Sequence, residues 1–61
     1  MRINEVKYNL AMARACKETK DLVKQGVSRT TLAQVAKKDL KPSTVGRIAK
    51  ALGCDVTDII D

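Results

Sequence analysis

The sequence predicts an all-α fold, a compact bundle of four to five short helices. Apolar residues recur at spacings of three and four along several stretches, and no stretch keeps the alternation of a β-strand for long. Leu, Ile and Val occupy 15 positions and Ala seven, a composition that suits thin, closely packed helices. At 61 residues the chain has room for one domain, residues 1–61.

The first helix is expected to begin at Asn4, a favourable N-cap residue, and to end near Cys16. Ile3 and Tyr8 form the apolar pair that often brackets such a cap. Lys7 and Arg14 are expected to face outward. The predicted inner stripe consists of Ile3, Val6, Leu10 and Ala13.

A short second helix is expected to begin at Thr19 as its cap, with Lys20 and Lys24 outward. Its inward residues are predicted to be Leu22 and Val23. Gly26 should end it, because glycine adopts the left-handed conformation that stops a helix.

The third helix is expected to run from its cap at Ser28 to about residue 37, with Val27 and Leu32 as a second bracketing pair. Its predicted inner face consists of Leu32, Val35 and Ala36. Its predicted outer face consists of Arg29, Thr30, Ala33, Gln34 and Lys37.

Residues 38–42 should form a loop, because Pro42 disfavours helix in the residue before it. Ser43 is the expected cap of a fourth helix, and Gly53 its end. The clearest amphipathic pattern of the chain lies between them, at Val45, Ile48, Ala49 and Leu52. A last turn, capped by Thr57, should bring back onto the core the side chains of Val56, Ile59 and Ile60.

The composition excludes several functional classes. There is no His and only two Cys, 38 positions apart, so neither a zinc site nor the usual base for a Ser or Cys nucleophile is expected. We predict no enzyme activity, cofactor or metal. The single aromatic residue cannot build a stacking platform for splayed bases, which argues against a protein that binds single-stranded nucleic acid in that way. No apolar run approaches the length of a bilayer span and no signal-peptide pattern opens the chain, which predicts a cytoplasmic protein with reduced thiols. A redox switch joining Cys16 and Cys54 is the alternative, which no other sequence feature favours.

The charge is uneven along the chain. The net charge is +5, but residues 55–61 carry Asp55, Asp58 and Asp61 and no base, so residues 1–54 hold 12 bases against four acids, or +8. Such an excess favours a polyanionic partner, although a solvated basic surface without a partner is the plain alternative.

Residues 19–35 are predicted to form a short helix, a turn at Gly26 and a capped second helix, which together make a helix-turn-helix arrangement. Aliphatic residues stand where the two helices would touch. The polar side chains left to reach base edges are Ser28, Arg29, Thr30 and Gln34.

With these residues in place, the chain resembles the lambda-repressor-like, Cro-type helix-turn-helix proteins (the XRE family). The resemblance lies in residues 26–32 (GVSRTTL), 41–45 (KPSTV) and 48–53 (IAKALG), and residues 55–60 are similar to the family's short last helix. The chain departs from the family in having one residue fewer between Leu22 and Gly26.

The resemblance implies that Arg29, Thr30 and Gln34 contact bases. Arg pairs with guanine and Gln with adenine, which suits these positions chemically. The resemblance also implies that a second set of residues contacts the DNA backbone or lies close to it: Thr19, Lys20, Ser28, Thr31, Lys37, Lys38 and Lys41.

The expected function is sequence-specific binding of double-stranded DNA by a small Cro- or repressor-type transcriptional regulator. Its recognition helix, about residues 28–37, would lie in the major groove. Any homodimer should be weak, formed through the last helix, through nearby loops such as that of Leu40, or only on DNA. The alternative is a protein-interaction module on the same scaffold, an adaptor or antagonist of another regulator.

Overall fold

The computed structural model describes residues 1–60, which form helices joined by short turns. Its elements are α1 (Glu5–Ala15), α2 (Thr19–Lys24), α3 (Arg29–Ala33), α4 (Pro42–Leu52) and a 3₁₀ turn, η1 (Val56–Asp58). The described residues contain no β-strand, only an isolated bridge between Ile3 and Ile60. The all-α prediction is therefore confirmed, in a globule with a radius of gyration of 9.9 Å. Asp61, counted above in the acidic end of the chain, lies outside the described residues.

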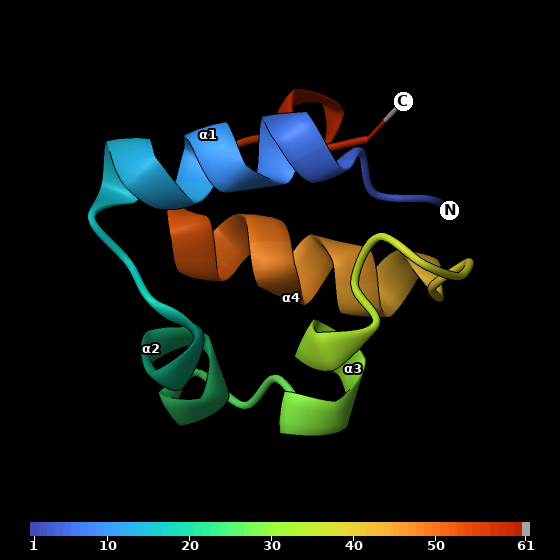
Figure 1. Ribbon diagram of the computed structural model, residues 1–61, viewed down its shortest axis with the longest axis horizontal. Coiled ribbons are helices and arrows are strands. Elements are labelled where there is room, and N and C mark those ends of the chain that lie inside the picture. The colour runs from blue at the N-terminus through green and yellow to red at the C-terminus, as the bar shows by residue number, and fades with distance from the viewer. Residues whose placement is uncertain (61) are drawn as a thin grey trace.

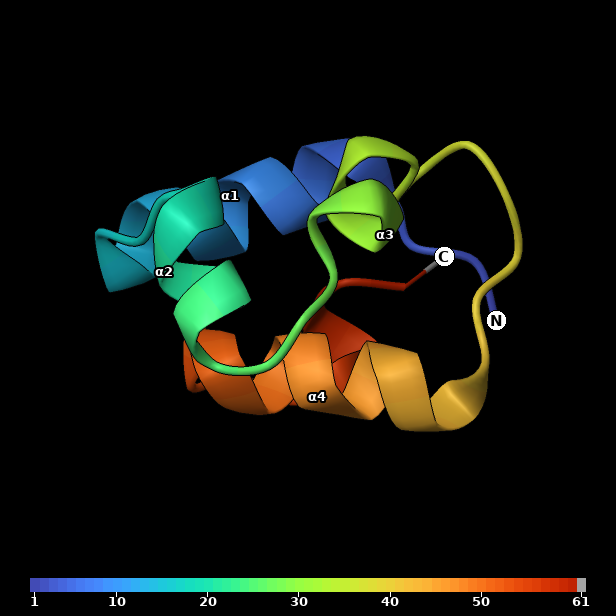
Figure 2. The ribbon, with the colours of Figure 1, turned by 90° about the horizontal axis from the view of Figure 1, so that it is seen from below.

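Helix α4 contributes four of the 13 buried core residues of the described chain, more than any other helix. Figure 1 shows it beside α1, with α2 and α3 below the pair. Figure 2, seen from below, shows α2 and α3 joined by a turn that passes close to α4. The four predicted apolar residues of α4 are all buried: Val45, Ile48, Ala49 and Leu52. Gly53 ends the helix with a φ of 70°, as the sequence predicted.

Two predicted caps are each wrong by two positions. α4 begins at Pro42 with Lys41 as its N-cap residue, not at Ser43. Proline suits the first helical position because its missing N–H has no partner there in any helix. η1 begins after Asp55, not Thr57, because the Asp55 N–H donates to the Asp58 carboxylate at 3.1 Å and closes a capping box.

The ends of α1 are as predicted, since Asn4 Oδ1 accepts from the Lys7 N–H at 3.0 Å and the helix ends at Cys16. The predicted inner stripe is wrong. Val6 and Leu10 are 68% and 50% exposed, and Ala13 is exposed as well. The buried residues of α1 are Tyr8 and Ala11, supported by the half-buried Met12 and Ala15. Ile3, which anchored the predicted stripe, precedes the helix, so its burial does not fix which side of the helix faces inward.

The two ends of the described chain meet beside α1. The Asn4 N–H donates to the Ile59 carbonyl at 2.8 Å, and Lys7 Nζ donates to the Ile60 carbonyl at 3.1 Å. Ile3 and Ile59 are buried there, and Ile60 and Val56 are half-buried, as predicted for the last turn.

Leu40 was expected to be exposed, as a contact for a second copy, and this prediction is wrong. It is only 8% exposed, and its N–H donates to the Met1 carbonyl at 2.7 Å. The loop after α3 therefore folds back on the first residues and buries its one large apolar side chain.

Candidate nucleic-acid interface

The candidate interface begins with α2, whose start differs from the prediction. The N-cap residue is Glu18 rather than Thr19, because the Glu18 N–H donates to Asp21 Oδ2 at 2.8 Å and completes a capping box. Thr19 is consequently the first helical residue and is exposed. Leu22, at 0% exposure, fixes the helix to the core, and Val23 is half-buried, as expected.

The turn between α2 and α3 requires the glycine found in it. Gly26 has a φ of 98°, a conformation that costs other residues free energy. Its N–H donates to the Val23 carbonyl at 3.0 Å, and the Val27 N–H donates to the Leu22 carbonyl at 3.1 Å. This pair of bonds is a Schellman motif, which ends α2 and sets the direction in which α3 leaves.

Helix α3 is shorter than predicted, spanning Arg29–Ala33 rather than reaching about residue 37. From Gln34 onward the chain continues in tighter turns, in which the Gln34 N–H donates to the Thr31 carbonyl at 3.1 Å and the Lys37 N–H to the Gln34 carbonyl at 3.0 Å. β-branched residues such as Thr31 and Val35 are weak helix formers, which favours this early end. Ser28 is the N-cap residue, as predicted, but its side chain makes no capping hydrogen bond.

The predicted division of this segment into two faces is confirmed. Leu32 and Val35 are buried and Ala36 is half-buried. The exposed residues are Ser28, Arg29, Thr30, Ala33, Gln34 and Lys37. Thr31 is half-buried. The three side chains assigned to base contact are therefore all exposed to solvent.

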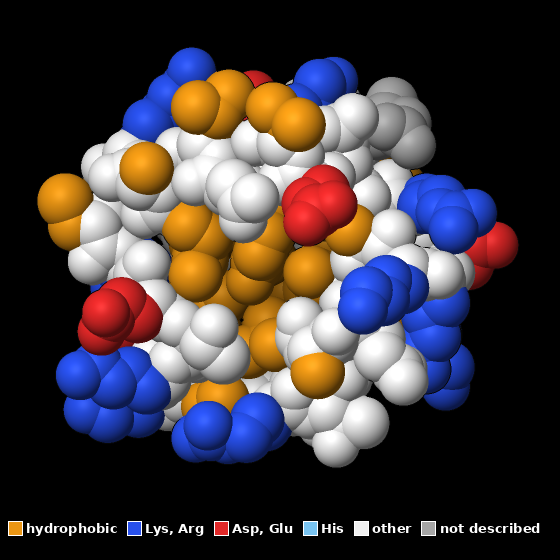
Figure 3. Space-filling model, viewed as in Figure 1, with side chains coloured by type: hydrophobic (Ala, Val, Ile, Leu, Met, Phe, Trp, Pro, Cys, Tyr) orange, Lys and Arg blue, Asp and Glu red, His pale blue; other side chains and the backbone are white. Residues whose placement is uncertain are grey.

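Cationic side chains lie on both sides of this surface. Thr19 and Lys20 belong to α2, whereas Lys37, Lys38 and Lys41 belong to the loop beyond α3, and Figures 1 and 2 show α2 and this loop on opposite sides of α3. Lys20 Nζ lies 3.4 Å from Glu18 Oε2, both ends of the pair being largely exposed. Figure 3 shows blue side chains over α2, near the α2–α3 turn and over the loop after α3. Apart from Ser28 and Thr31, which belong to the α3 segment itself, the predicted backbone contacts thus form two separate groups, one on α2 and one in the loop after α3.

The structure adds basic residues that the sequence reasoning did not assign. Arg47 and Lys50, both exposed on α4, line a shallow hollow with Gln25 of the α2–α3 turn. From the sequence, α4 was predicted only to contribute its apolar side to the core. The available signal was two cations three positions apart on the polar side of this amphipathic helix, which follows the predicted helix-turn-helix.

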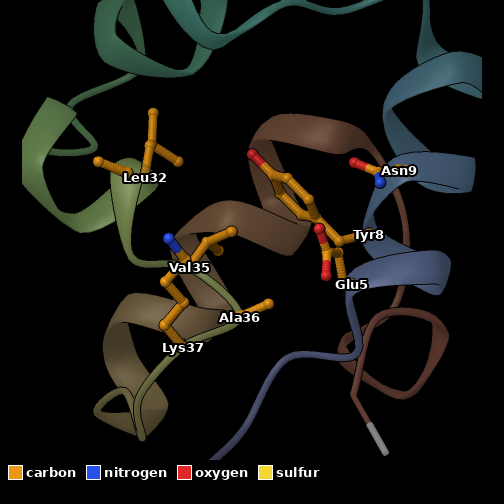
Figure 4. Close-up of a pocket in the computed structure, with 8 residues that line it drawn as sticks. Glu5, Tyr8, Asn9, Leu32, Val35, Ala36 and Lys37 are labelled. Carbon is orange, nitrogen blue, oxygen red and sulfur yellow. The ribbon is translucent and has the colours of Figure 1, made fainter.

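A hollow of about 180 Å³, lined by both polar and apolar residues, lies between α3 and α1. Figure 4 shows Leu32 and Val35 on one side of it and Tyr8, with Glu5 and Asn9, on the other. The orange area at the centre of Figure 3 lies over this gap between α1 and the α2–α3 pair. It is an opening onto the core beside the inner residues of α3, which are buried by packing in the core cluster.

Both thiols are free, Cys16 exposed and Cys54 half-buried. Burial, and then the nearby carboxylates of Asp58 and Asp55, raise the pKa of the Cys54 thiol above its ordinary value. Within residues 1–60 no group of three or more His, Cys, Asp or Glu side chains could hold a metal ion. No helix in this part of the chain has the length and hydropathy needed to cross a bilayer.

In comparisons of the chain with known proteins, no protein-family model matches it, and no curated protein or solved structure gives a significant match. The resemblance to the lambda-repressor-like proteins consequently rests on the sequence motifs alone.

Proposed function

We propose that this chain binds double-stranded DNA sequence-specifically and acts as a small transcriptional regulator of the Cro or repressor type. In this proposal α2, the Gly26 turn and α3 form a helix-turn-helix. The segment from Ser28 to Lys37 enters the major groove, in which Arg29, Thr30 and Gln34 contact base edges.

The observation that carries the proposal is the contrast between the two sides of α3. Leu32 and Val35 are buried and anchor this segment to the core, while Arg29, Thr30 and Gln34 are all exposed. A helix that contacts bases in the major groove needs both a buried and an exposed side, because base contacts require donors and acceptors on a surface whose backbone is fixed. The exposed lysines on either side of α3 supply charge where a duplex passes over it.

The test is binding of a fluorescent duplex library, followed by titration of the best selected site over a range of salt concentrations. We expect binding at low salt and a slope of log affinity against log salt of roughly −0.9 for each phosphate neutralised. The variant R29A/T30A/Q34A should bind selected and unrelated duplexes equally, because only the base contacts are lost. Its far-ultraviolet circular dichroism controls for folding. Failure of the unaltered protein to bind any duplex at low salt would contradict the proposal.

The alternative proposal, a protein-interaction module, is favoured by one observation. Val6 and Leu10 are exposed on α1, one helical turn apart. In the alternative proposal the variant V6T/L10Q would lose partner binding, whereas the DNA-binding proposal expects this variant to bind duplex as the unaltered protein does.

A further inference from the structure

A third hollow lies beside the α2–α3 turn, where α4 passes under the first residues of α3. It has a volume of about 150 Å³, and its lining residues come from two segments that are separated in the sequence, 26–31 and 44–47: Gly26, Val27, Ser28, Thr31, Thr44 and Arg47. Two of its side chains, Thr44 and Arg47, stand three positions apart on α4 and therefore on neighbouring turns of one helix side.

The polar groups of this hollow are all able to donate hydrogen bonds. Ser28, Thr31 and Thr44 each carry a hydroxyl, and Arg47 carries a guanidinium with five N–H donors in a fixed fork. No acidic residue lines the hollow. Within residues 1–60 none of these four side chains has a hydrogen bond or ion pair. The donors are thus available to an anion with several oxygens.

Arg47 also lines the neighbouring shallow hollow, together with Lys50, Gln25 and Ala51. The two hollows therefore share one guanidinium and contain two cations and no acid between them. Like charges three positions apart on a helix repel each other, and a bound anion relieves that repulsion.

We infer that the hollow formed by Ser28, Thr31, Thr44 and Arg47 binds a phosphate group of the DNA backbone. This inference rests on the proposed function and extends it to α4, which the sequence analysis left out of the interface. A DNA phosphate is the occupant because Ser28 directly precedes Arg29 and Thr30, the side chains that face the bases in the proposal. A phosphate bound here fixes the position of α3 along the groove, since backbone contacts set register while base contacts set sequence. Arg47 is suited to it, because guanidinium matches phosphate oxygens two at a time.

The test compares R47Q with the matched control R14Q, which removes the same charge from an exposed position on α1. On the selected duplex and on unrelated duplexes alike, we expect R47Q to lower affinity roughly tenfold. It should also reduce the size of the salt slope by about 0.9. R14Q should leave the slope unchanged. R47K should restore the slope but only part of the affinity, because lysine lacks the planar fork.

A second arm identifies the ligand group directly. Backbone phosphates of the selected duplex are replaced one at a time by neutral methylphosphonate. One position should weaken binding of the unaltered protein and of R14Q but cause no further loss with R47Q. Duplex binding by the unaltered protein with equal losses for R47Q and R14Q would overturn this inference and leave the proposed function standing. Absence of duplex binding by the unaltered protein would overturn both.

Discussion

Cys16 ends α1 in the left-handed conformation, with a φ of 54°, which a side chain with a Cβ adopts at a cost of roughly 1–2 kcal/mol. The Cys16 N–H donates to the Ala13 carbonyl and the Lys17 N–H to the Met12 carbonyl, so the hydrogen bonds of this end use backbone groups alone. Cys16→Gly should therefore raise the free energy of unfolding by roughly 0.5–1 kcal/mol, the relieved strain less the added freedom of the unfolded chain. Urea unfolding measures this as a higher midpoint with an unchanged slope. Ala15→Gly, one position earlier and inside α1, should instead be destabilising, and equal effects of the two changes would contradict the argument.

Tyr8 should make the free energy of unfolding depend on pH in the alkaline range. Burial raises the pKa of its phenol above the ordinary value of 10.0. A group whose pKa is higher in the folded state stabilises that state fully below its unfolded pKa, and this contribution is lost as the pH rises through the folded pKa. Unfolding free energy should therefore fall as the pH rises above 10.0, and Tyr8→Phe should remove that part of the decline. The chain has a single tyrosine, so tyrosinate absorbance reports this site alone, and a titration midpoint at the ordinary value would refute the prediction. The raised pKa of Cys54 adds a decline of the same sign, which remains in the Phe variant.

Gln34 and Lys38 are both exposed but should respond differently to substitution if the proposed function is correct. Gln34→Ala should weaken binding to the selected site by about 1–3 kcal/mol and relax the preference at one base pair. Lys38→Ala should weaken binding to all sequences alike and flatten the salt slope. Titration of both variants against the selected duplex and single-base-pair changes of it separates the two roles. An equal loss on every sequence would remove Gln34 from the base contacts, and an unchanged slope would remove Lys38 from the phosphate contacts.

At the scale of elements, α1 presents apolar residues on two opposite sides. Tyr8 and Ala11 are buried, whereas Val6 and Leu10 face solvent. Leu10→Gln should consequently change the free energy of unfolding by no more than about 0.5 kcal/mol. Tyr8→Ala should cost several kcal/mol, about 3–5 for a buried ring, and thermal unfolding of the two variants distinguishes them. A large loss of stability for Leu10→Gln would show that the outer side of α1 is buried in solution, as it would be between two copies.

Helix α4 could be predicted almost completely from the sequence and α1 only in part, for a physical reason. In α4 a single apolar stripe faces a single polar side, so periodicity defines which side is buried. In α1 two stripes compete, and the choice depends on what α4 and η1 present to it, which is a long-range property. Ile3 paired with Tyr8 across the cap was the local hint to the correct side.

The candidate site could likewise be predicted from the sequence only in part. The buried and exposed residues of α3 could be predicted from local spacing, because Leu32 and Val35 stand three positions apart and therefore lie on one side of a helix. The hollow that contains Arg47 could not be predicted, since it exists only where residues 26–31 meet residues 44–47 across the fold. The length of α3 was overestimated because apolar spacing continues through Val35 in turns that keep the same side inward.

For the molecule as a whole, stability depends on contacts between the two ends of the described chain. Ile3 is 2% exposed, its neighbour Asn4 donates to the Ile59 carbonyl, and Ile3 and Ile60 form the isolated bridge. A chain of this size has a free energy of unfolding of only roughly 3–9 kcal/mol. One core contact is therefore a large fraction of the total.

Ile3→Ala should lower the free energy of unfolding by about 2–5 kcal/mol, enough to unfold much of the population if the starting value is low. Ile3→Val, with a smaller expected loss of about 0.5–1.5 kcal/mol, keeps the measurement within range if the Ala variant does not fold. Because the contact joins the ends of the described chain, its loss should destabilise every helix together. Circular dichroism, which reports all helices, and the fluorescence of Tyr8, which reports α1, should therefore give coincident transitions with the same shifted midpoint. A shift of the tyrosine signal alone would mean that α1 and the chain ends unfold separately from α2, α3 and α4.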